Sequence, residues 1–442
     1  MKMDSDHLYR HSKPYALLRK ITSFYHSLYY ENISVVNIEN IPSGDPVIFT
    51  PVHQNALMDA LAIIYTADKQ PVFMARADIF KKDVLRKILT SLKIIPVYRI
   101  RDGKEALSNN DSSFELAFQV LKSNGAVGIM PEGNHGEQRR LRPLKKGVAR
   151  LAIQAQELLG KKASIKIVPV GLEYSNYYTF RSNLLVIYGK PIDITDYLDE
   201  YKINAAKGLQ LIRTRLSDEL KSIMIDIDTD EYYDTIYEAK ELYSYSKRED
   251  VPDLYDKFLL EKNLTDKLVS LSNNNPEKMR ELKSLMLELT SKASALKLKP
   301  WIFSWNPPLK SVDWFSDILR YTVFFPVFIF AALFHAVPYI SSEILSHKTE
   351  DKQFVSTMRF VISFLFYLLW YFFILIMPFS IIMKGILLLT MPIFGIISYD
   401  YWDSLKKANI KFRFLLLKHQ KSKELFNTQK LFKELIQWLE KR

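Results

Sequence analysis

The feature that most constrains the fold of this 442-residue chain is its strongly apolar C-terminal third. Residues 321–340 form an apolar run of about 20 residues, the length that crosses a bilayer as a helix. After a polar loop, residues 360–398 are almost entirely apolar and carry one charged residue, Lys384. This second run is too long for one helix. It is therefore either two tightly turned spans or one span with a re-entrant or interfacial piece. We expect two spans in all, over 321–340 and 360–383, with the piece after Lys384 re-entrant or interfacial. The chain is expected to be an integral membrane protein, with its membrane region over 311–400.

The flanks of this region indicate its orientation. A Trp- and Pro-rich approach over 300–320 is typical of the boundary between water and lipid. The basic, amphipathic tail over 401–442 is expected in the cytoplasm, because cytoplasmic flanks of spans carry an excess of Lys and Arg. The N-terminal residues lack an uninterrupted apolar core of signal-peptide length, so the leading domain is expected in the cytoplasm as well. Two ends on one side favour an even number of crossings.

Composition narrows the set of partners. Lys and Arg outnumber Asp and Glu by 61 to 49, which gives a formal charge of +12. Beside an apolar third of the chain, this excess favours anionic membrane lipids over nucleic acid as the partner. The chain has no Cys, which excludes disulfides, thiol nucleophiles and Cys-ligated metals. No Gly-rich dinucleotide motif, P-loop or metal-ligand cluster occurs in the sequence, so we expect no cofactor and no metal.

Residues 1–32 form a basic segment rich in aromatic residues. The apolar residues of this segment fall on one stripe of a predicted helix: Leu17, Leu18, Ile21, Phe24, Leu28 and Tyr29. Two interpretations stay open, an interfacial membrane helix or a helix packed on the domain that follows.

Residues 33–225 alternate between strand-like and helix-like runs. Seven runs are predicted strands: 33–38, 46–52, 71–75, 94–100, 126–131, 165–172 and 184–189. Four runs between them are predicted helices: 58–67, 82–92, 112–123 and 144–159. This alternation predicts an α/β domain with a central, largely buried sheet flanked by helices. Residues 226–310 are highly charged and helical in pattern, and we interpret them as a scaffold or spacer.

One strand-to-helix junction carries a candidate for chemistry, in the sequence PVHQNALMDAL over 51–61. The strand delivers His53 to the start of a helix, where Asn55 is available as a cap. Asp59 falls on the first turns of that helix, close enough to fold back on the imidazole. A His oriented by a carboxylate can take a proton from an alcohol near neutral pH. The alternative interpretation is a surface His beside a helix cap.

Four stretches of this domain resemble, in order and spacing, the blocks of the glycerolipid acyltransferase family. HQNALMD is similar to the family's His–Asp block, although five residues separate His53 from Asp59 where four are usual. Five also occur in some glycerol-3-phosphate acyltransferases of the family. MARADIF and IIPVYRIRDG are similar to the second block, IMPEGNHGEQRRLRPLKK to the third, and IVPVGLEY, centred on Pro169, to the fourth. The resemblance covers roughly residues 33–225 and implies an acyltransferase-type domain.

The second block implies basic residues that face the phosphate of the acceptor. Its candidates are Arg76, Arg99 and Arg101, with Arg99 first. Arg suits this task because its planar guanidinium can bind two phosphate oxygens at once.

The third block differs from the family pattern at a position expected to bind the phosphate of the acceptor. Glu132 and Gly133 match the pattern, and Glu132 is expected to orient the acceptor or the arginines; the alternative is a structural carboxylate at the turn. His135 stands where the family has its phosphate-binding Arg. The resemblance therefore leaves His135, or Arg139 and Arg140 just beyond it, to supply the charge, with a solvated basic face as the alternative for the two arginines.

The resemblance also implies the reaction. His53 would be the base for an acceptor hydroxyl, Asp59 would fix its tautomer, and backbone N–H groups at the start of the next helix would face the oxyanion. The acyl group would pass from acyl-CoA or acyl carrier protein to 1-acylglycerol-3-phosphate, giving phosphatidic acid. Glycerol-3-phosphate or another lysolipid is the alternative acceptor. A non-catalytic membrane scaffold and a small transporter are the alternatives from other classes.

Overall fold

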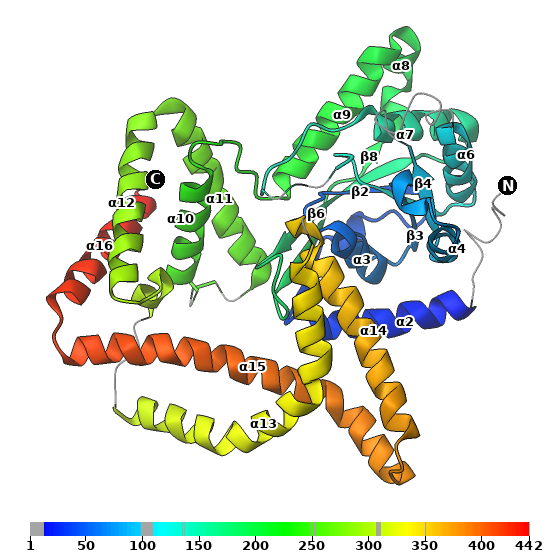
Figure 1. The fold of residues 1–442 in the computed structure, drawn as a ribbon. Helices are drawn as coiled ribbons and strands as arrows, with labels where there is room; N and C mark the ends of the chain where they lie inside the picture. Colours follow the sequence, from blue (N-terminus) through cyan, green and yellow to red (C-terminus); the bar gives the residue numbers. More distant parts are fainter. Residues whose placement is uncertain are drawn as a thin grey trace. The chain divides into compact units, whose positions relative to one another are not determined.

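The computed structural model describes residues 13–98, 109–134, 136, 138–248, 250–251, 253–305, 311–349 and 351–441. The chain divides into two compact units (Figure 1). The first comprises Met1–Ile225 together with Asp351–Thr357, and the second comprises Asp226–Glu350 together with Met358–Arg442. The first unit thus combines the predicted α/β region with a short segment from much later in the sequence.

The first unit is built on one sheet. Its strands are β1 (Ile33–Val36), β2 (Val47–Pro51), β3 (Pro71–Arg76), β4 (Ile94–Val97), β5 (Ala126–Ile129), β6 (Lys166–Tyr174), β7 (Leu184–Tyr188) and β8 (Ile192–Asp193). Its described α-helices are α2 (Lys13–Tyr29), α3 (Ala56–Thr66), α4 (Asp83–Ser91), α6 (Asn109–Lys122), α7 (Lys146–Leu159), α8 (Leu198–Ile203) and α9 (Ala205–Ser222). Short 3-10 helices are η1 (Ile38–Asn40), η2 (Ala77–Phe80) and η4 (Ile194–Tyr197). All seven predicted strands and all four predicted helices of this region are present, whereas β8 is too short to leave a pattern in the sequence.

The topology of the sheet brings several carboxyl ends of strands together. The strand order is β1-β7-β6-β2-β5-β3-β4, and β8 pairs with β6 outside this path. The strands from β6 to β4 run parallel to one another, whereas β7 is antiparallel to β6. The register places Phe49 of β2 opposite Gly128 of β5 and Val168 of β6. The carboxyl ends of β2, β5 and β3 therefore meet at one edge, where ligands bind in open α/β sheets.

The centre of the sheet is buried on both faces. Val47, Ile48 and Phe49 of β2 are fully covered, and strands buried in this way carry continuous apolar runs instead of alternation. Figure 1 shows α3 below the sheet and α6, α7 and α9 above it. The predicted fold class, an α/β domain with a central sheet flanked by helices, is confirmed.

Helix α2 combines features of both interpretations of the N-terminal segment. It packs on the first unit, since Nη2 of Arg19 donates to the carbonyl of Ile64 at 2.7 Å and His26 is buried. Part of its apolar stripe nevertheless faces outward, with Leu17 61% and Phe24 60% exposed, whereas Tyr29 at the end of the stripe is buried. The helix is held on the domain by one face and presents apolar side chains on another.

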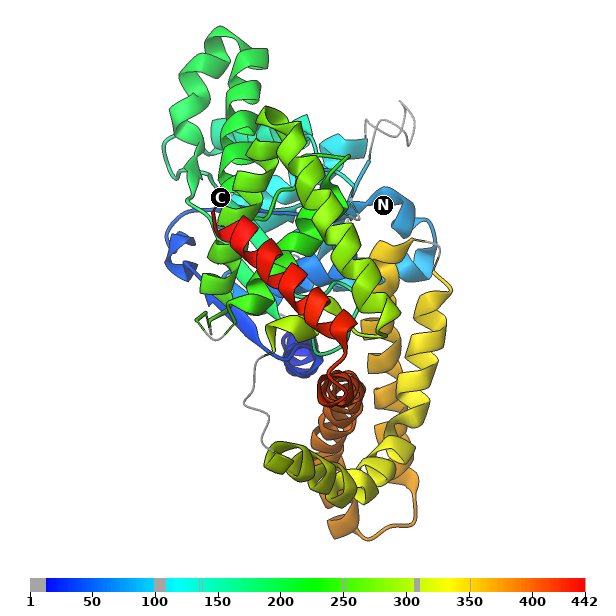
Figure 2. The same cartoon turned by 90° about the vertical axis from the view of Figure 1, so that its left-hand side faces the viewer.

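The second unit is helical in every element that the structure describes. Its helices are α10 (Tyr233–Ser246), α11 (Leu254–Asn274), α12 (Pro276–Ala295), η5 (Pro300–Ser304), α13 (Ser311–His347), α14 (Val355–Ile376), α15 (Ile381–His419) and α16 (Lys423–Glu440). Helices α10, α11 and α12 pack together, and α16 lies along α12 (Figure 2). Leu268, Leu282, Leu289 and Leu435 are buried in this bundle.

Three described helices are long and apolar enough to cross a membrane: Ile318–His347, Lys352–Ile376 and Ile381–His419. These helices indicate membrane association. The expected limits of the second span are wrong, because α14 ends at Ile376 and a new helix starts at Ile381. Pro378 disfavours continuation of α14, and the side chain of Ser380 caps α15 by accepting from the N–H of Met383 at 3.3 Å.

Lys384 therefore lies in the first turn of α15 and not at the end of a span. The residues after Lys384 do not form a short re-entrant piece either, since α15 runs over 39 residues and continues into the tail expected after residue 400.

Candidate active site

The candidate site begins at the carboxyl end of β2, the strand that pairs with β5 on one side and β6 on the other. His53 lies two residues after the end of β2, and Asp59 lies in the first turn of α3. Nδ1 of His53 is 3.1 Å from Oδ2 of Asp59. The His53 side chain is 16% exposed and that of Asp59 is 1% exposed. A substrate can therefore reach the imidazole, whereas the carboxylate is shielded.

The Asp59 carboxylate is held from several sides. Oδ2 accepts from the backbone N–H groups of Gln54 (2.9 Å) and Asn55 (2.8 Å) as well as from His53. Oδ1 accepts from the hydroxyl of Tyr174 at 2.9 Å. A carboxylate fixed in this way keeps the proton of the imidazole on Nδ1, which leaves Nε2 to accept a proton.

The backbone N–H groups at the start of α3 are already hydrogen-bonded. Those of Gln54 and Asn55 donate to Asp59, that of His53 donates to Glu132, and that of Leu57 donates to Oγ1 of Thr357. The expectation that N–H groups at this helix start face the oxyanion is wrong for these four groups. The five-residue spacing of the His–Asp pair is compatible with a turn that wraps around the carboxylate.

Glu132 lies just after the carboxyl end of β5, and its carboxylate accepts hydrogen bonds from backbone N–H groups. Its Oε1 accepts from the N–H of His53 at 2.9 Å, and its Oε2 accepts from the N–H of Arg142 at 3.2 Å. Burial raises the pKa of Glu132 to about 7, although both backbone contacts oppose that shift. Gly133 follows with φ of 68°, in the left-handed region that favours glycine. This geometry favours the structural carboxylate over a residue that orients the acceptor directly.

Arg76 and Arg140, two of the predicted phosphate-binding residues, lie in the part of the chain that the structure describes. Arg76 pairs with Asp78 at 2.5 Å, and Arg140 is half-buried. Three further candidates for the phosphate site lie outside the described residues: Arg99, Arg101 and His135.

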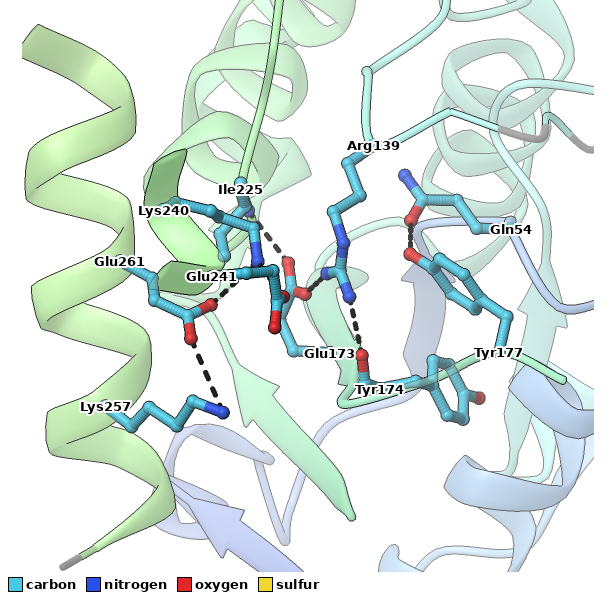
Figure 3. A network of polar contacts seen from close by, with 10 residues as sticks. All are labelled: Gln54, Arg139, Glu173, Tyr174, Tyr177, Ile225, Lys240, Glu241, Lys257 and Glu261. Carbon is cyan, nitrogen blue, oxygen red and sulfur yellow. Dashed lines mark hydrogen bonds and ion pairs between the residues drawn. The ribbon is translucent and has the colours of Figure 1, made fainter. Parts of the chain in front are cut away.

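Arg139 is buried and is not available to a phosphate. Its guanidinium pairs with the carboxylate of Glu173 and donates from Nη2 to the carbonyl of Tyr174 at 2.5 Å (Figure 3). Glu173 also accepts from the N–H of Ile225 at 2.9 Å. The prediction of a phosphate-binding Arg139 is wrong, because this side chain joins the third block to β6.

Arg142 is a functional candidate that the sequence did not single out. A Cβ on Gly136 would lie 2.5 Å from Nη2 of Arg142, so the guanidinium occupies space that a larger residue would take. The N–H of Gly136 in turn lies 3.4 Å from the carbonyl oxygen of His53, to which it donates. Within the described residues the Arg142 guanidinium forms no ion pair. Its position inside a run of several basic residues gave no signal that distinguished it from its neighbours.

The fold places a His–Asp pair, a pairing suited to general-base chemistry, just after the carboxyl end of a central parallel strand. No group of three or more His, Asp or Glu side chains among the described residues is placed to hold a metal ion. Residues 32–173 match the family model described as Acyltransferase, so this part of the chain is an acyltransferase domain. The resemblance drawn from the four sequence blocks is confirmed.

Two named relatives are similar to part of this chain. Glycerol-3-phosphate O-acyltransferase 2 of Saccharomyces cerevisiae is 29% identical over 136 residues, which cover 30% of this chain and 18% of that protein. A 1-acyl-sn-glycerol-3-phosphate acyltransferase of Cocos nucifera is 27% identical over 156 residues, which cover 34% of this chain and 46% of that protein. The chain thus spans less than half the length of either relative.

Part of the chain is also similar to a solved structure. The 1-acyl-sn-glycerophosphate acyltransferase of Thermotoga maritima aligns with a TM-score of 0.33 and 16% identity, over 47% of this chain and 81% of that chain. A likeness this distant carries no argument about function.

Proposed function

We propose that this protein transfers a fatty acyl group from an acyl thioester to the free hydroxyl of 1-acylglycerol-3-phosphate, giving phosphatidic acid. The observation that carries the proposal is the contact between His53 and the buried carboxylate of Asp59, inside an acyltransferase domain. The donor would be acyl-CoA or an acyl carrier protein thioester, and the domain would face the cytoplasm. The membrane supplies the lipid acceptor and retains the lipid product.

The reaction follows from the orientation of the imidazole. Nε2 of His53 removes the hydroxyl proton as the acceptor oxygen attacks the thioester carbonyl carbon. The tetrahedral intermediate collapses with cleavage of the C–S bond, and the thiolate receives the proton back from the imidazolium. Asp59 stabilises that imidazolium through Nδ1. The products are an ester and a free thiol, and no acyl-enzyme is required.

The acceptor phosphate needs a cation near the base. Arg142 suits this role because its guanidinium lies on Gly136, the residue that bonds to the backbone of His53. A guanidinium can bind two phosphate oxygens with parallel hydrogen bonds, which also orients the hydroxyl of the acceptor. We assign the acceptor phosphate to Arg142 in place of the arginine that the family carries at the position of His135.

Glycerol-3-phosphate is the second candidate acceptor. The five-residue spacing between His53 and Asp59 favours it, and the matched Saccharomyces cerevisiae protein carries that substrate in its name. Another lysolipid is a further alternative of the same class, and a non-catalytic membrane scaffold is the alternative from a different class.

The test uses membranes that contain the wild type, His53→Ala or His419→Ala, a labelled acyl thioester and one of three acceptors. The acceptors are 1-acylglycerol-3-phosphate, glycerol-3-phosphate and a neutral lysolipid. His419 is exposed and serves as the matched control. We expect an ester on 1-acylglycerol-3-phosphate with the wild type and His419→Ala but not with His53→Ala. Absence of an ester on every acceptor, with all three proteins folded, would favour the scaffold.

A further inference from the structure

The segment Asp351–Thr357 belongs to the acyltransferase unit although it follows one membrane-type helix in sequence and overlaps the start of the next, Lys352–Ile376. We call it the linker segment. It includes η6 (Lys352–Phe354), which packs against α3, and the first residues of α14. Gln353 and Ser356 are 8% and 2% exposed, so the segment is buried at these positions. A connection between spans would be expected in solvent, and its burial on the catalytic domain needs a reason.

The first contact of the linker segment is with the start of α3. Oγ1 of Thr357 accepts from the N–H of Leu57 at 3.2 Å. The first N–H groups of a helix have no intrahelical acceptor and are usually satisfied by a capping side chain nearby in sequence. Asn55, at the cap position of α3, makes no such hydrogen bond. Thr357 therefore provides an acceptor that the local sequence does not.

The turn that Thr357 holds is strained. Ala56, the residue before Leu57, has φ of 45°. A non-glycine residue costs about 1–3 kcal/mol in sparsely populated backbone regions and persists only where the surroundings impose it. Asp59 holds this turn on one side through the N–H groups of Gln54 and Asn55. Thr357 holds it on the other.

The second contact of the linker segment leads to the same turn by another route. The hydroxyl of Ser356 donates to the carbonyl of Tyr177. The hydroxyl of Tyr177 donates to the side-chain oxygen of Gln54, whose backbone N–H donates to Asp59. Both contacts of the linker segment therefore end on the residues that separate His53 from Asp59.

We infer that Ser356 and Thr357 are positioning residues of the acyl-transfer site, through which the start of the second membrane-type helix fixes the turn carrying His53. This inference rests on the proposed acyl transfer. A catalytic domain released from this segment keeps its fold but loses the geometry of the His53–Asp59 pair.

The kinetic test compares Thr357→Val with Thr357→Ser in membranes, using whichever acceptor the wild type esterifies. Val keeps the shape of Thr but has no oxygen to accept from Leu57, whereas Ser keeps that oxygen. We expect Thr357→Val to lower kcat about tenfold with little change in the KM of the acceptor, which is the pattern for a lost transition-state geometry. Thr357→Ser is expected within about twofold of the wild type. Thr349→Val, in the same loop but outside the linker segment, is the control.

A second measurement does not depend on activity. The chain has no Cys, so cysteines introduced together at Leu57 and Thr357 are the only thiols. A short bis-maleimide should join them within one chain and shift its migration on a denaturing gel. Two results would overturn the inference. The first is an unchanged kcat in Thr357→Val when the wild type forms the ester. The second is absence of the cross-link when each cysteine alone reacts with maleimide. Absence of any ester with the wild type contradicts the proposed function instead, and the cross-link still reports on the docking.

Discussion

Tyr174 donates a hydrogen bond from its hydroxyl to Oδ1 of Asp59, the carboxylate oxygen that does not contact His53, at 2.9 Å. The hydroxyl is fully buried at the carboxyl end of β6, and burial next to Asp59 raises its pKa well above the usual range. It therefore remains a donor near neutral pH. The strand that pairs with β2 thus holds the carboxylate that orients the base carried by β2.

Replacement of Tyr174 by Phe tests this support. Asp59 keeps its two backbone donors, so we expect kcat to fall about threefold to tenfold and the free energy of unfolding to fall by about 1–3 kcal/mol for a buried acceptor left without its partner. Steady-state kinetics and thermal unfolding in detergent measure the two effects. A loss of activity as large as that of His53→Ala would contradict the supporting role and assign Tyr174 to the chemistry itself.

Asp59→Asn tests the orientation of the base more severely. The amide keeps the size of the carboxylate but places an NH2 group where an oxygen accepts hydrogen bonds, so the imidazole loses its fixed tautomer. We expect kcat to fall at least about 100-fold, the lower end of what general acid–base catalysis contributes, with a small change in KM. Asp196→Asn, at an exposed position, is the matched control. Equal activity of the two variants would remove Asp59 from the mechanism.

Arg142 and Arg139 offer a matched pair for acceptor binding. Arg142→Ala is expected to raise the KM for a phosphate-bearing acceptor at least about tenfold, because a charge-assisted contact is worth about 1.5–3 kcal/mol. The KM of a neutral lysolipid, where one is accepted, should not change. Arg139→Ala is expected to lower stability instead, since it leaves the buried carboxylate of Glu173 without its partner. An unchanged KM in Arg142→Ala would return the phosphate site to residues of the second block.

The sequence predicted what depends on local pattern. The strands were visible because buried parallel strands carry continuous apolar runs, and the His53–Asp59 pair was visible because both residues flank one strand-to-helix junction. Contacts between distant segments left no such pattern. Arg139 and Arg142 look alike in one basic run, and only Glu173 of β6 and Gly136 distinguish their environments.

The same limit applies to the region around α3 and to the membrane helices. The acceptor for the N–H of Leu57 comes from Thr357, 300 residues further along the chain, and no local rule points to it. The predicted end of the second span lies beyond the end of α14, because the residues on both sides of that end are apolar. Pro378 indicates the helix end, but the hydropathy pattern alone does not.

Buried His26 contributes to the dependence of stability on acid. Its side chain is 1% exposed and packs edge-on against the rings of Tyr30 and Tyr65, both 4.9 Å away. Burial lowers the pKa of His26 to about 3 from 6.5. Between these values the unfolded chain binds a proton that the folded chain does not, so stability falls as the pH drops below 6.5.

At pH 5 this linkage amounts to about 2 kcal/mol, since each pH unit below 6.5 contributes about 1.4 kcal/mol. His26→Phe keeps the ring contacts and removes the titration. On going from pH 7.5 to pH 5, the wild type is expected to lose about 4–8 °C more in Tm than His26→Phe, measured by thermal unfolding in detergent. The raised pKa of Glu132 makes a contribution to stability that falls with rising pH. Both proteins contain Glu132, so this contribution cancels in the comparison. Parallel Tm curves for the two proteins would show that His26 is protonated as readily in the folded chain as in the unfolded one.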